Sequence, residues 1–340
     1  MSPTLNLAIG GALIAAVAVA AVVLGTTERP PMDSIQRGYR GLAMSEIYNP
    51  RLLNETIADN KVPLSIPPLG NGGPKASAVY KNVQVLGDES VGNFTRLMAS
   101  ITNWVSPVQG CAYCHDVNNM AADTVYTKVV SRRMLQMVRH INADWKTHVA
   151  ETGVTCYTCH RGQPVPAAIW FNNPGPLQAG GFAQIPAGKN HPTPVANNSS
   201  LPLDPFTPLL EHDENIRIEA EQALPGTDRQ SIKQTDWTYS LMIHFSQSLG
   251  VNCTYCHNTR QFANWSESTP QRVTAWYGIR MVRDLNVSYL DPLQSAFPAG
   301  RLGPEGDSPK VNCATCHEGV YKPLFGVSMA KDFPELTTTH

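Results

Sequence analysis

The cysteines of this 340-residue chain follow one pattern, and that pattern constrains its fold more than any other feature. All eight belong to C-x-x-C-H motifs, each closed by a histidine: Cys111, Cys114 and His115; Cys156, Cys159 and His160; Cys253, Cys256 and His257; Cys313, Cys316 and His317. This is the attachment sequence of c-type haem, in which two thiols add to the porphyrin vinyl groups and the adjacent imidazole binds iron. Zinc sites, redox dithiols and disulfide frameworks do not require that histidine. The sequence therefore predicts four covalently bound c-type haems.

The motifs form two pairs, and the two halves of the chain resemble each other. Residues 137–142 (MVRHIN) match residues 281–286 (MVRDLN) at four of six positions. We therefore expect a mainly α-helical multihaem cytochrome c with long irregular loops and two pseudo-symmetric haem-pair halves. The expected divisions are a transmembrane anchor 1–27, an irregular N-terminal segment 28–92, a first haem-pair half 93–162, a Pro-rich connection 163–231, a second haem-pair half 232–325 and a C-terminal tail 326–340.

Residue types at helix ends predict where three helices of the two halves begin. The expected helices are 237–249 with Asp236 as N-cap and Gly250 after it, a helix after Thr269 from Pro270 to about Leu285, and a run from Asp123 through His140 as far as Thr152 before Gly153.

The N-terminal run from Leu5 to Leu24 contains one polar residue, Asn6, and is long enough to cross a bilayer. A secretory signal peptide is the competing interpretation, but such peptides carry basic residues before the apolar core, and no Lys or Arg precedes Arg29. We therefore expect a retained single-span helix. Because c-type haem is attached outside the cytoplasmic membrane, we expect the protein in the inner membrane with its haem domain on the periplasmic side.

The charge balance excludes one class of partner. The chain has 26 basic and 27 acidic side chains, so it lacks the basic surface of a nucleic-acid-binding protein. Charged residues make up only 16%, below the roughly 25% of soluble domains. This low content suggests that part of the surface is covered by a partner.

Each haem iron needs a second axial ligand unless that position is left open for a substrate, and methionine or histidine usually supplies it. Each half is expected to consist of a helix, a haem motif, a second helix and a second haem motif. Met98, Met134 and Met242 each lie on a helix that precedes a motif in this order, and the repeat makes Met98 and Met242 equivalent. A methionine on a helix is more often simple core packing. Here four irons need partners, so we take these three as candidate thioether ligands.

The fourth haem breaks this pattern. Aligning the two MVR segments places Gly278 opposite Met134, so this position offers no side chain to the haem of His317. The same alignment pairs Met137 with Met281, which makes Met134 the simpler ligand and Met137 a packing residue. The residues alone leave the fourth ligand open among the remaining histidines: His140, His148, His191, His212, His244 and His340.

These features together resemble the membrane-attached tetrahaem cytochrome subunit of the photosynthetic reaction centre of purple bacteria, from residues 37–41 to the last haem motif. The resemblance implies four axial pairs: Met98 with His115, Met134 with His160, Met242 with His257, and His148 with His317. Many members carry a lipid-modified cysteine after the apolar run, whereas the first cysteine here is Cys111. A transmembrane helix is expected to replace the lipid anchor, as in some relatives.

The resemblance also implies a function. Four six-coordinate irons would leave no position for a substrate, so we expect an electron carrier and not an enzyme. A soluble cytochrome c or a high-potential iron-sulfur protein would donate electrons, and the photo-oxidised bacteriochlorophyll pair in the L and M subunits would accept them. The light-harvesting antenna is a further candidate partner, through the N-terminal helix.

Two other functions are compatible with four haem motifs. A membrane-anchored quinol dehydrogenase also combines one N-terminal helix with four motifs, but it relies mostly on histidine ligands or an open site. A multihaem nitrite reductase would need one five-coordinate iron, which cyanide or nitrite binding would reveal.

Overall fold

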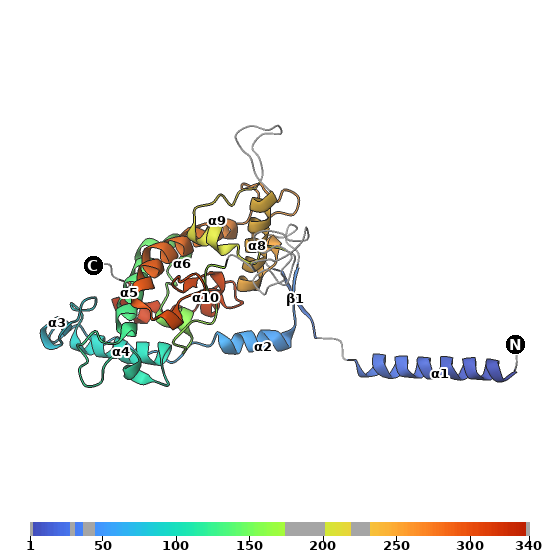
Figure 1. The fold of residues 1–340 in the computed structure, drawn as a ribbon, viewed down its shortest axis with the longest axis horizontal. Coiled ribbons are helices and arrows are strands. Elements are labelled where there is room, and N and C mark those ends of the chain that lie inside the picture. Colours follow the sequence, from blue (N-terminus) through green and yellow to red (C-terminus); the bar gives the residue numbers. More distant parts are fainter. Residues whose placement is uncertain (1–2, 28–30, 37–44, 174–200, 219–231, 338–340) are drawn as a thin grey trace, which may run out of the picture.

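The computed structural model describes residues 3–27, 31–36, 45–173, 201–218 and 232–337, which are mainly helical (Figure 1). The α-helices in these ranges are α1 (Pro3–Thr26), α2 (Pro50–Asp59), α3 (Ala76–Val79), α4 (Val91–Val105), α5 (Tyr126–Asp144), α6 (Lys146–Val149), α7 (Cys156–His160), α8 (Ile232–Leu249), α9 (Pro270–Asp284) and α10 (Cys313–His317). The predicted mainly α-helical class with an apolar N-terminal helix is confirmed.

Strands and short helices occupy the segments between these helices. Two antiparallel pairs of strands are described: β1 (Asp33–Gln36) with β2 (Ser45–Tyr48), and β3 (Ile169–Trp170) with β4 (Lys310–Val311). The short helical turns are η1 (Gly110–Tyr113), η3 (Thr207–Glu211), η4 (Cys253–Tyr255), η5 (Leu285–Leu290), η6 (Asp291–Ala296), η7 (Ala299–Arg301), η8 (Pro323–Gly326), η9 (Ala330–Asp332) and η10 (Pro334–Leu336). The segment 28–92, expected to be irregular, thus contains a hairpin and the helices α2 and α3.

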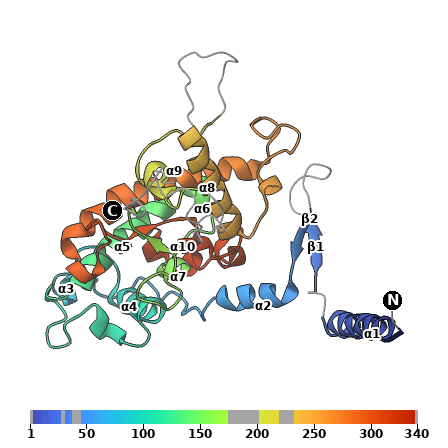
Figure 2. The same cartoon turned by 45° about the vertical axis from the view of Figure 1, so that its right-hand side comes forward.

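Helix α1 is, among the described helices, the one long and apolar enough to cross a membrane. Its window Ile9–Thr26 has a mean hydropathy of 2.3, and none of it is buried against the rest of the chain. At 1.5 Å per residue its 24 residues extend about 36 Å, more than the hydrocarbon thickness of a bilayer. Figures 1 and 2 show α1 extending away from the helices that carry the haem motifs.

Two buried asparagines tie the long helices to the segments that precede the second motif of each pair. Asn142 at the end of α5 accepts a hydrogen bond from Val154 N at 2.7 Å and donates to Val154 O at 2.9 Å. Asn286 accepts from Val311 N at 2.9 Å and donates to Val311 O at 3.0 Å. Their amides also donate to carbonyl groups of distant segments: Leu336 at 2.8 Å for the first and Leu210 at 2.9 Å for the second. Both asparagines close an MVR segment, so the two segments make corresponding contacts.

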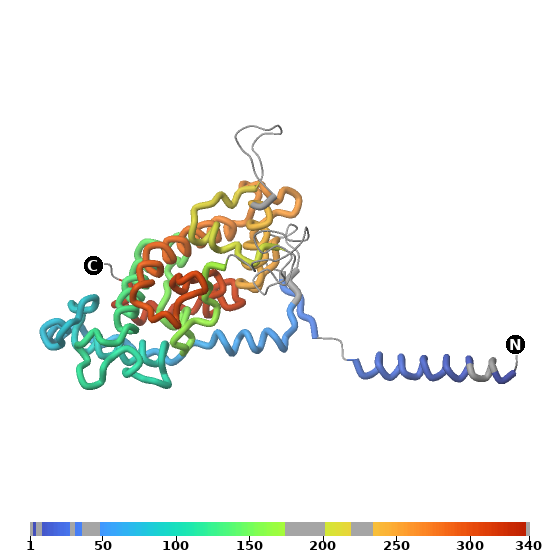
Figure 3. Tube along the Cα trace, in the orientation of Figure 1, coloured from blue at the N-terminus to red at the C-terminus, as the bar shows by residue number. Residues whose placement is uncertain are grey.

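The end of α5 meets the end of α9 and the turn η5, stretches that are far apart in the sequence (Figure 3). His140 and Asp284 occupy the same place in the two MVR segments, and His140 Nε2 lies 2.6 Å from Asp284 Oδ2. Asp144 lies 2.7 Å from Nδ1 of the same imidazole. Trp145 donates to Asp284 at 2.9 Å, and the His140 ring stacks on Tyr289 with ring centres 5.2 Å apart. A polar contact therefore joins the first half of the chain to the second.

The predicted helix starts had different outcomes. The start of α9 is confirmed, because Thr269 is its N-cap and Pro270 its first residue. The predicted start of α8 is wrong: the helix begins at Ile232, so Asp236 lies inside it. Helix α5 begins at Tyr126, since the Asp123 carboxylate instead binds Arg132 at 2.7 Å. The run then breaks at Trp145, which separates α5 from α6.

We predict that Asn286→Ala lowers the midpoint of thermal unfolding of the haem-loaded protein. Asn286 is fully buried, and its removal leaves Val311 N–H, Val311 O and Leu210 O without this partner. Each unsatisfied buried group costs about 1–3 kcal/mol. Asn54→Ala on the exposed face of α2 is the control and should change stability by no more than about 0.5 kcal/mol. Equal midpoints for the two variants, measured by calorimetry, would contradict the role of the buried amide.

Candidate haem-binding centre

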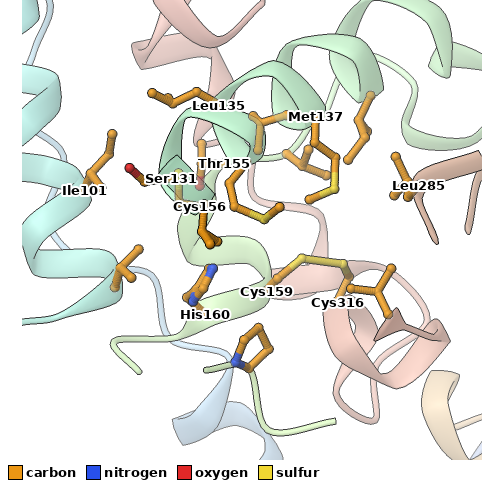
Figure 4. Close-up of a pocket in the computed structure, with 18 of the residues that line it drawn as sticks. Ile101, Ser131, Leu135, Met137, Thr155, Cys156, Cys159, His160, Leu285 and Cys316 are labelled. Atoms are coloured by element: carbon orange, nitrogen blue, oxygen red, sulfur yellow. A yellow bond between two sulfur atoms is a disulfide. The ribbon is translucent and has the colours of Figure 1, made fainter. Parts of the chain in front are cut away.

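A largely apolar cavity of about 1180 Å³ lies among α4, α5, α7, α9 and α10. The cysteines and histidine of three of the four haem motifs line its wall: Cys111, Cys114 and His115; Cys156, Cys159 and His160; Cys313, Cys316 and His317. Met98, Met134 and His148 line the same cavity. Figure 4 shows part of it, with Met137 of α5 on one side and the cysteines of α7 on the other. The cavity therefore brings nine motif residues together with three of the predicted second ligands.

The imidazole of every motif histidine is fixed by a hydrogen bond from Nδ1 to a backbone carbonyl oxygen. The four pairs are His115 with Met120 O at 3.0 Å, His160 with Gln163 O at 2.9 Å, His257 with Phe262 O at 2.9 Å and His317 with Val320 O at 2.9 Å. A carbonyl oxygen can only accept, so Nδ1 carries the proton and Nε2 keeps its lone pair. This orients a metal-binding histidine and raises the basicity of its free nitrogen. All four imidazoles are therefore in the tautomer that binds a metal through Nε2.

The local backbone around the motifs differs between the first and the second of each pair. The first motifs lie on the single turns η1 and η4, and their carbonyl acceptor is five residues after the histidine. The second motifs form α7 and α10, and their acceptor is three residues after it. A threonine inside each of these short helices holds the N-terminal turn: Thr158 accepts from Thr155 N, and Thr315 from Asn312 N, both at 2.9 Å.

His148 on α6 lies against the motif histidine of α10. The ring centres of His148 and His317 are 6.1 Å apart, with the rings inclined by 66°. Two imidazoles on opposite sides of one iron have ring centres roughly 6 Å apart, given metal–nitrogen bonds of about 2.0 Å. Nδ1 of His148 also donates to a backbone carbonyl, Thr274 O at 2.9 Å, so its Nε2 is likewise free. The separation of the two rings suits a pair of axial ligands.

The other spare histidines have different surroundings. Both nitrogens of His140 face carboxylates, as described above. His244 is buried, and burial lowers its pKa to about 4, while His212 is exposed. His191 and His340 lie outside the described residues. Of the spare histidines in the described ranges, His148 is the one whose ring lies against a motif histidine.

Two of the three candidate methionine ligands line the cavity with the motif residues. Met98 on α4 and Met134 on α5 are half-buried and line the cavity. Met137 lines it too, but it belongs to the apolar core and is only 8% exposed. In the described part of the chain, the cysteines and histidine of the third motif and Met242 are not among the residues that line this cavity, although Tyr255 inside that motif is. The ring of its histidine, His257, instead stacks on Phe262 with ring centres 4.2 Å apart.

Burial adjusts the ionisation of the donor groups. It lowers the pKa of His148, His160 and His257, and burial with the nearby His148 lowers that of His317 to about 4. These imidazoles are therefore neutral at pH 7, which is the state that binds a metal. Burial also raises the pKa of the Cys156 and Cys313 thiols to about 12.

The second cysteines of α7 and α10 are adjacent. Cys159 and Cys316 are joined by a disulfide, with Cα atoms 4.5 Å apart (Figure 4). A sulfur atom in a disulfide cannot also form a thioether with a porphyrin, so this bond and haem attachment are alternatives for the two thiols. The contact brings the second motifs of the two pairs side by side.

The donor set and the cavity fit c-type haem. The cavity wall is mostly apolar, as a porphyrin requires, and it carries paired thiols, oriented imidazoles and thioether side chains. Residues Cys111, Cys114, Cys156, Cys159, Cys313 and Cys316 would form the thioethers in it, and the bound group would supply reversible one-electron chemistry.

Two supporting threonines were not identified as such from the sequence. Thr127 and Thr269 each donate a hydrogen bond from Oγ1 to a carbonyl inside a first motif, Tyr113 O and Tyr255 O. The separation is 14 residues in both cases. This equal spacing in the two halves is a signal that the repeat could have provided.

Comparison with known proteins identifies the family of this chain. A family model described as the photosynthetic reaction centre cytochrome C subunit matches residues 28–337. The chain is 54% identical over 318 residues to the photosynthetic reaction center cytochrome c subunit of Rubrivivax gelatinosus, covering 93% of this chain and 87% of that one. It is 52% identical over 339 residues to the protein of that name from Thermochromatium tepidum, covering 100% and 82%. The protein of that name from Roseobacter denitrificans is 41% identical over 345 residues, covering 97% and 92%.

We predict that Met134→Leu removes one sulfur–iron bond and that Met137→Leu does not. Met134 is the half-buried residue that the repeat replaces by Gly278, whereas Met137 is buried in the core like its counterpart Met281. The two variants differ only in which methionine is lost, so each is the control for the other. The measurements are the weak sulfur-to-iron absorption band of the ferric protein and a redox titration. A weaker band only in Met137→Leu would reverse the assignment.

Proposed function

Because the chain belongs to the family of photosynthetic reaction-centre cytochrome c subunits, which are electron-transfer components of the photosynthetic membrane, we propose that it re-reduces the photo-oxidised bacteriochlorophyll pair. The acceptor is the pair held by the L and M subunits. The donor is a soluble periplasmic cytochrome c or high-potential iron-sulfur protein. The observation that carries this proposal is the common orientation of the four motif histidines, each with Nδ1 bonded to a carbonyl and Nε2 free.

The proposal assigns four haems to the chain. Each is attached by one cysteine pair: Cys111 and Cys114, Cys156 and Cys159, Cys253 and Cys256, Cys313 and Cys316. Their axial ligands are Met98 and His115, Met134 and His160, Met242 and His257, and His148 and His317. The first three pairs combine a thioether with an imidazole, and the fourth combines two imidazoles. Because a thioether raises the reduction potential relative to a second imidazole, three sites are of higher potential and one of lower.

The two halves of the chain are proposed to be related by a pseudo-twofold arrangement. Corresponding contacts support this arrangement. Asn142 and Asn286 each form hydrogen bonds with the backbone of a valine that lies two residues before a second motif. Arg139 and Arg283, which occupy the same place in the MVR segments, donate to Glu335 O at 2.8 Å and Leu209 O at 3.1 Å. The C-terminal turn η10 thus packs on the first half as η3 packs on the second.

The arrangement of the motifs supports a linear order of the four sites. The second motifs, on α7 and α10, are adjacent through Cys159 and Cys316, so their sites are the inner two. The first motifs follow α4 and α8 and form the outer two. In both Figures 1 and 2, α8 lies on the side of the body from which α2 leads to β1 and α1, and α4 lies away from it. The site of His257 is therefore proposed to be nearest the membrane and the site of His115 farthest from it.

Helix α1 is proposed to anchor the protein in the cytoplasmic membrane, with the haem domain in the periplasm and contact to the light-harvesting antenna as a further role. Its length and apolar composition support a spanning helix. The low share of charged residues in the chain, 16%, agrees with a body that is partly covered by other subunits.

We predict that one flash oxidises a haem of this chain in membranes where it is assembled with its reaction centre. A redox titration of the same membranes should resolve three higher midpoints and one lower. Met242→His should lower one of the higher midpoints by on the order of 0.1 V, since a second imidazole stabilises the ferric state more than a thioether does. Met281→Leu, which alters a core methionine outside the proposed ligand set, is the control. A flash that leaves every haem reduced while the pigment cation persists would refute the function.

We predict that residues 5–24 remain attached and hold the protein in the membrane. Intact-mass measurement of the detergent-extracted protein should include this segment. Replacing residues 1–27 by a cleavable secretory signal should release a soluble periplasmic protein that still carries its haems. A mature N-terminus near Thr26 would show that the segment is a signal peptide.

A further inference from the structure

Helix α9 passes directly over the imidazole of His148, and the closest point of contact is a glycine. A Cβ atom on Gly278 would lie 2.6 Å from His148 Cε1, 2.9 Å from Nδ1 and 3.3 Å from Nε2. Distances under about 3.0 Å require one group to move. The atoms in the way belong to an imidazole ring that two contacts hold in place. Its Nδ1 donates a hydrogen bond to Thr274 O at 2.9 Å, and its centre lies 6.1 Å from that of the His317 ring. The ring therefore cannot yield without losing a contact.

The backbone gives no other reason for glycine at this position. Gly278 lies within α9 and is not among the glycines with a positive φ angle. Glycine inside a helix is less favourable than alanine, so the residue weakens its own helix. The structure shows one feature that offsets this loss of helix stability: the absent side chain leaves space for the His148 ring. Thr274, the hydrogen-bond acceptor, lies one helical turn before Gly278 on the same face of α9.

We infer that Gly278 is a specificity-determining residue that selects imidazole over thioether as the second axial ligand of the His317 haem. The inference rests on the proposed ligation of that haem by His148. Met134 occupies the matching position of the first half, three residues before its MVR segment, and it lines the cavity. A methionine side chain at this place supplies sulfur from its own helix, whereas glycine admits a histidine that reaches over from α6. One position thus sets one site to low potential and its counterpart to high potential.

The first test is a pair of substitutions in the haem-loaded protein. Gly278→Ala should displace His148, so that one haem loses its low-spin bis-imidazole spectrum and binds carbon monoxide. Gly278→Met should add a fourth thioether ligand, which strengthens the sulfur-to-iron band and moves the lowest midpoint upward. Gly300→Ala is the control, because a Cβ there meets nothing within 4 Å. Unchanged spectra and midpoints in both Gly278 variants would overturn the inference.

A second measurement separates this inference from the proposed ligation and does not depend on the stability of one variant. His148→Gly should open the site so that added imidazole restores the bis-imidazole spectrum. If His148→Gly leaves all four haems and midpoints unchanged, the ligation by His148 is wrong. In His148→Gly with Gly278→Ala, imidazole should bind about tenfold more weakly, because the added methyl group overpacks the space of the ring; tenfold corresponds to about 1.4 kcal/mol. Equal imidazole affinity in the single and double variants would refute the role of Gly278 alone.

Discussion

The hydrogen bond from the Nδ1 of each motif histidine to a nearby backbone carbonyl is the interaction on which the rest of the structure depends. It fixes the tautomer and direction of the imidazole, and it recurs with nearly the same length in all four motifs, 2.9 or 3.0 Å. A carbonyl three or five residues after the histidine can reach Nδ1 only if the chain turns sharply after the motif. In α7 and α10 that turn is provided by Arg161 and Glu318, the C-cap residues with left-handed backbone angles. The oriented nitrogen then requires a cavity on its free side, and the long helices supply its walls.

The long helices are in turn held by contacts that pass between distant parts of the chain. Asn142 at the end of α5 and Asn286 in η5 bind the segments that precede α7 and α10. They also bind Leu336 near the C-terminus and Leu210 in η3. The buried pair of Arg96 and Glu335, 2.6 Å apart, adds a link from α4 to the C-terminal turn η10. Removing either charge would leave the other buried without its partner, which is strongly destabilising. The helices that present the candidate ligands therefore depend on residues far from the haem motifs.

The sequence was sufficient for the parts of this architecture that local chemistry dictates. The four motifs, the apolar helix α1 and the start of α9 at Thr269-Pro270 each rest on neighbouring residues. The start of α8 could not be read in this way, since Asp236 has the composition of an N-cap but lies inside the helix. Asp123 was also misleading, because Arg132 and Lys128 bind its carboxylate. The meeting of His148 with His317 joins residues from the two halves, and only the folded chain shows that Gly278 leaves room for it.

The adjacency of Cys159 and Cys316 has a consequence for how the protein is made. Two thiols whose Cα atoms are 4.5 Å apart are within the range for a disulfide, which forms readily in an oxidising compartment. Such a bond would occupy one sulfur from each of the motifs on α7 and α10, so it would prevent complete attachment at both motifs at once. Alkylation and mass measurement of chains captured before attachment would distinguish the oxidised from the reduced precursor. If this bond forms before haem attachment, it has to be reduced before Cys159 or Cys316 can form a thioether.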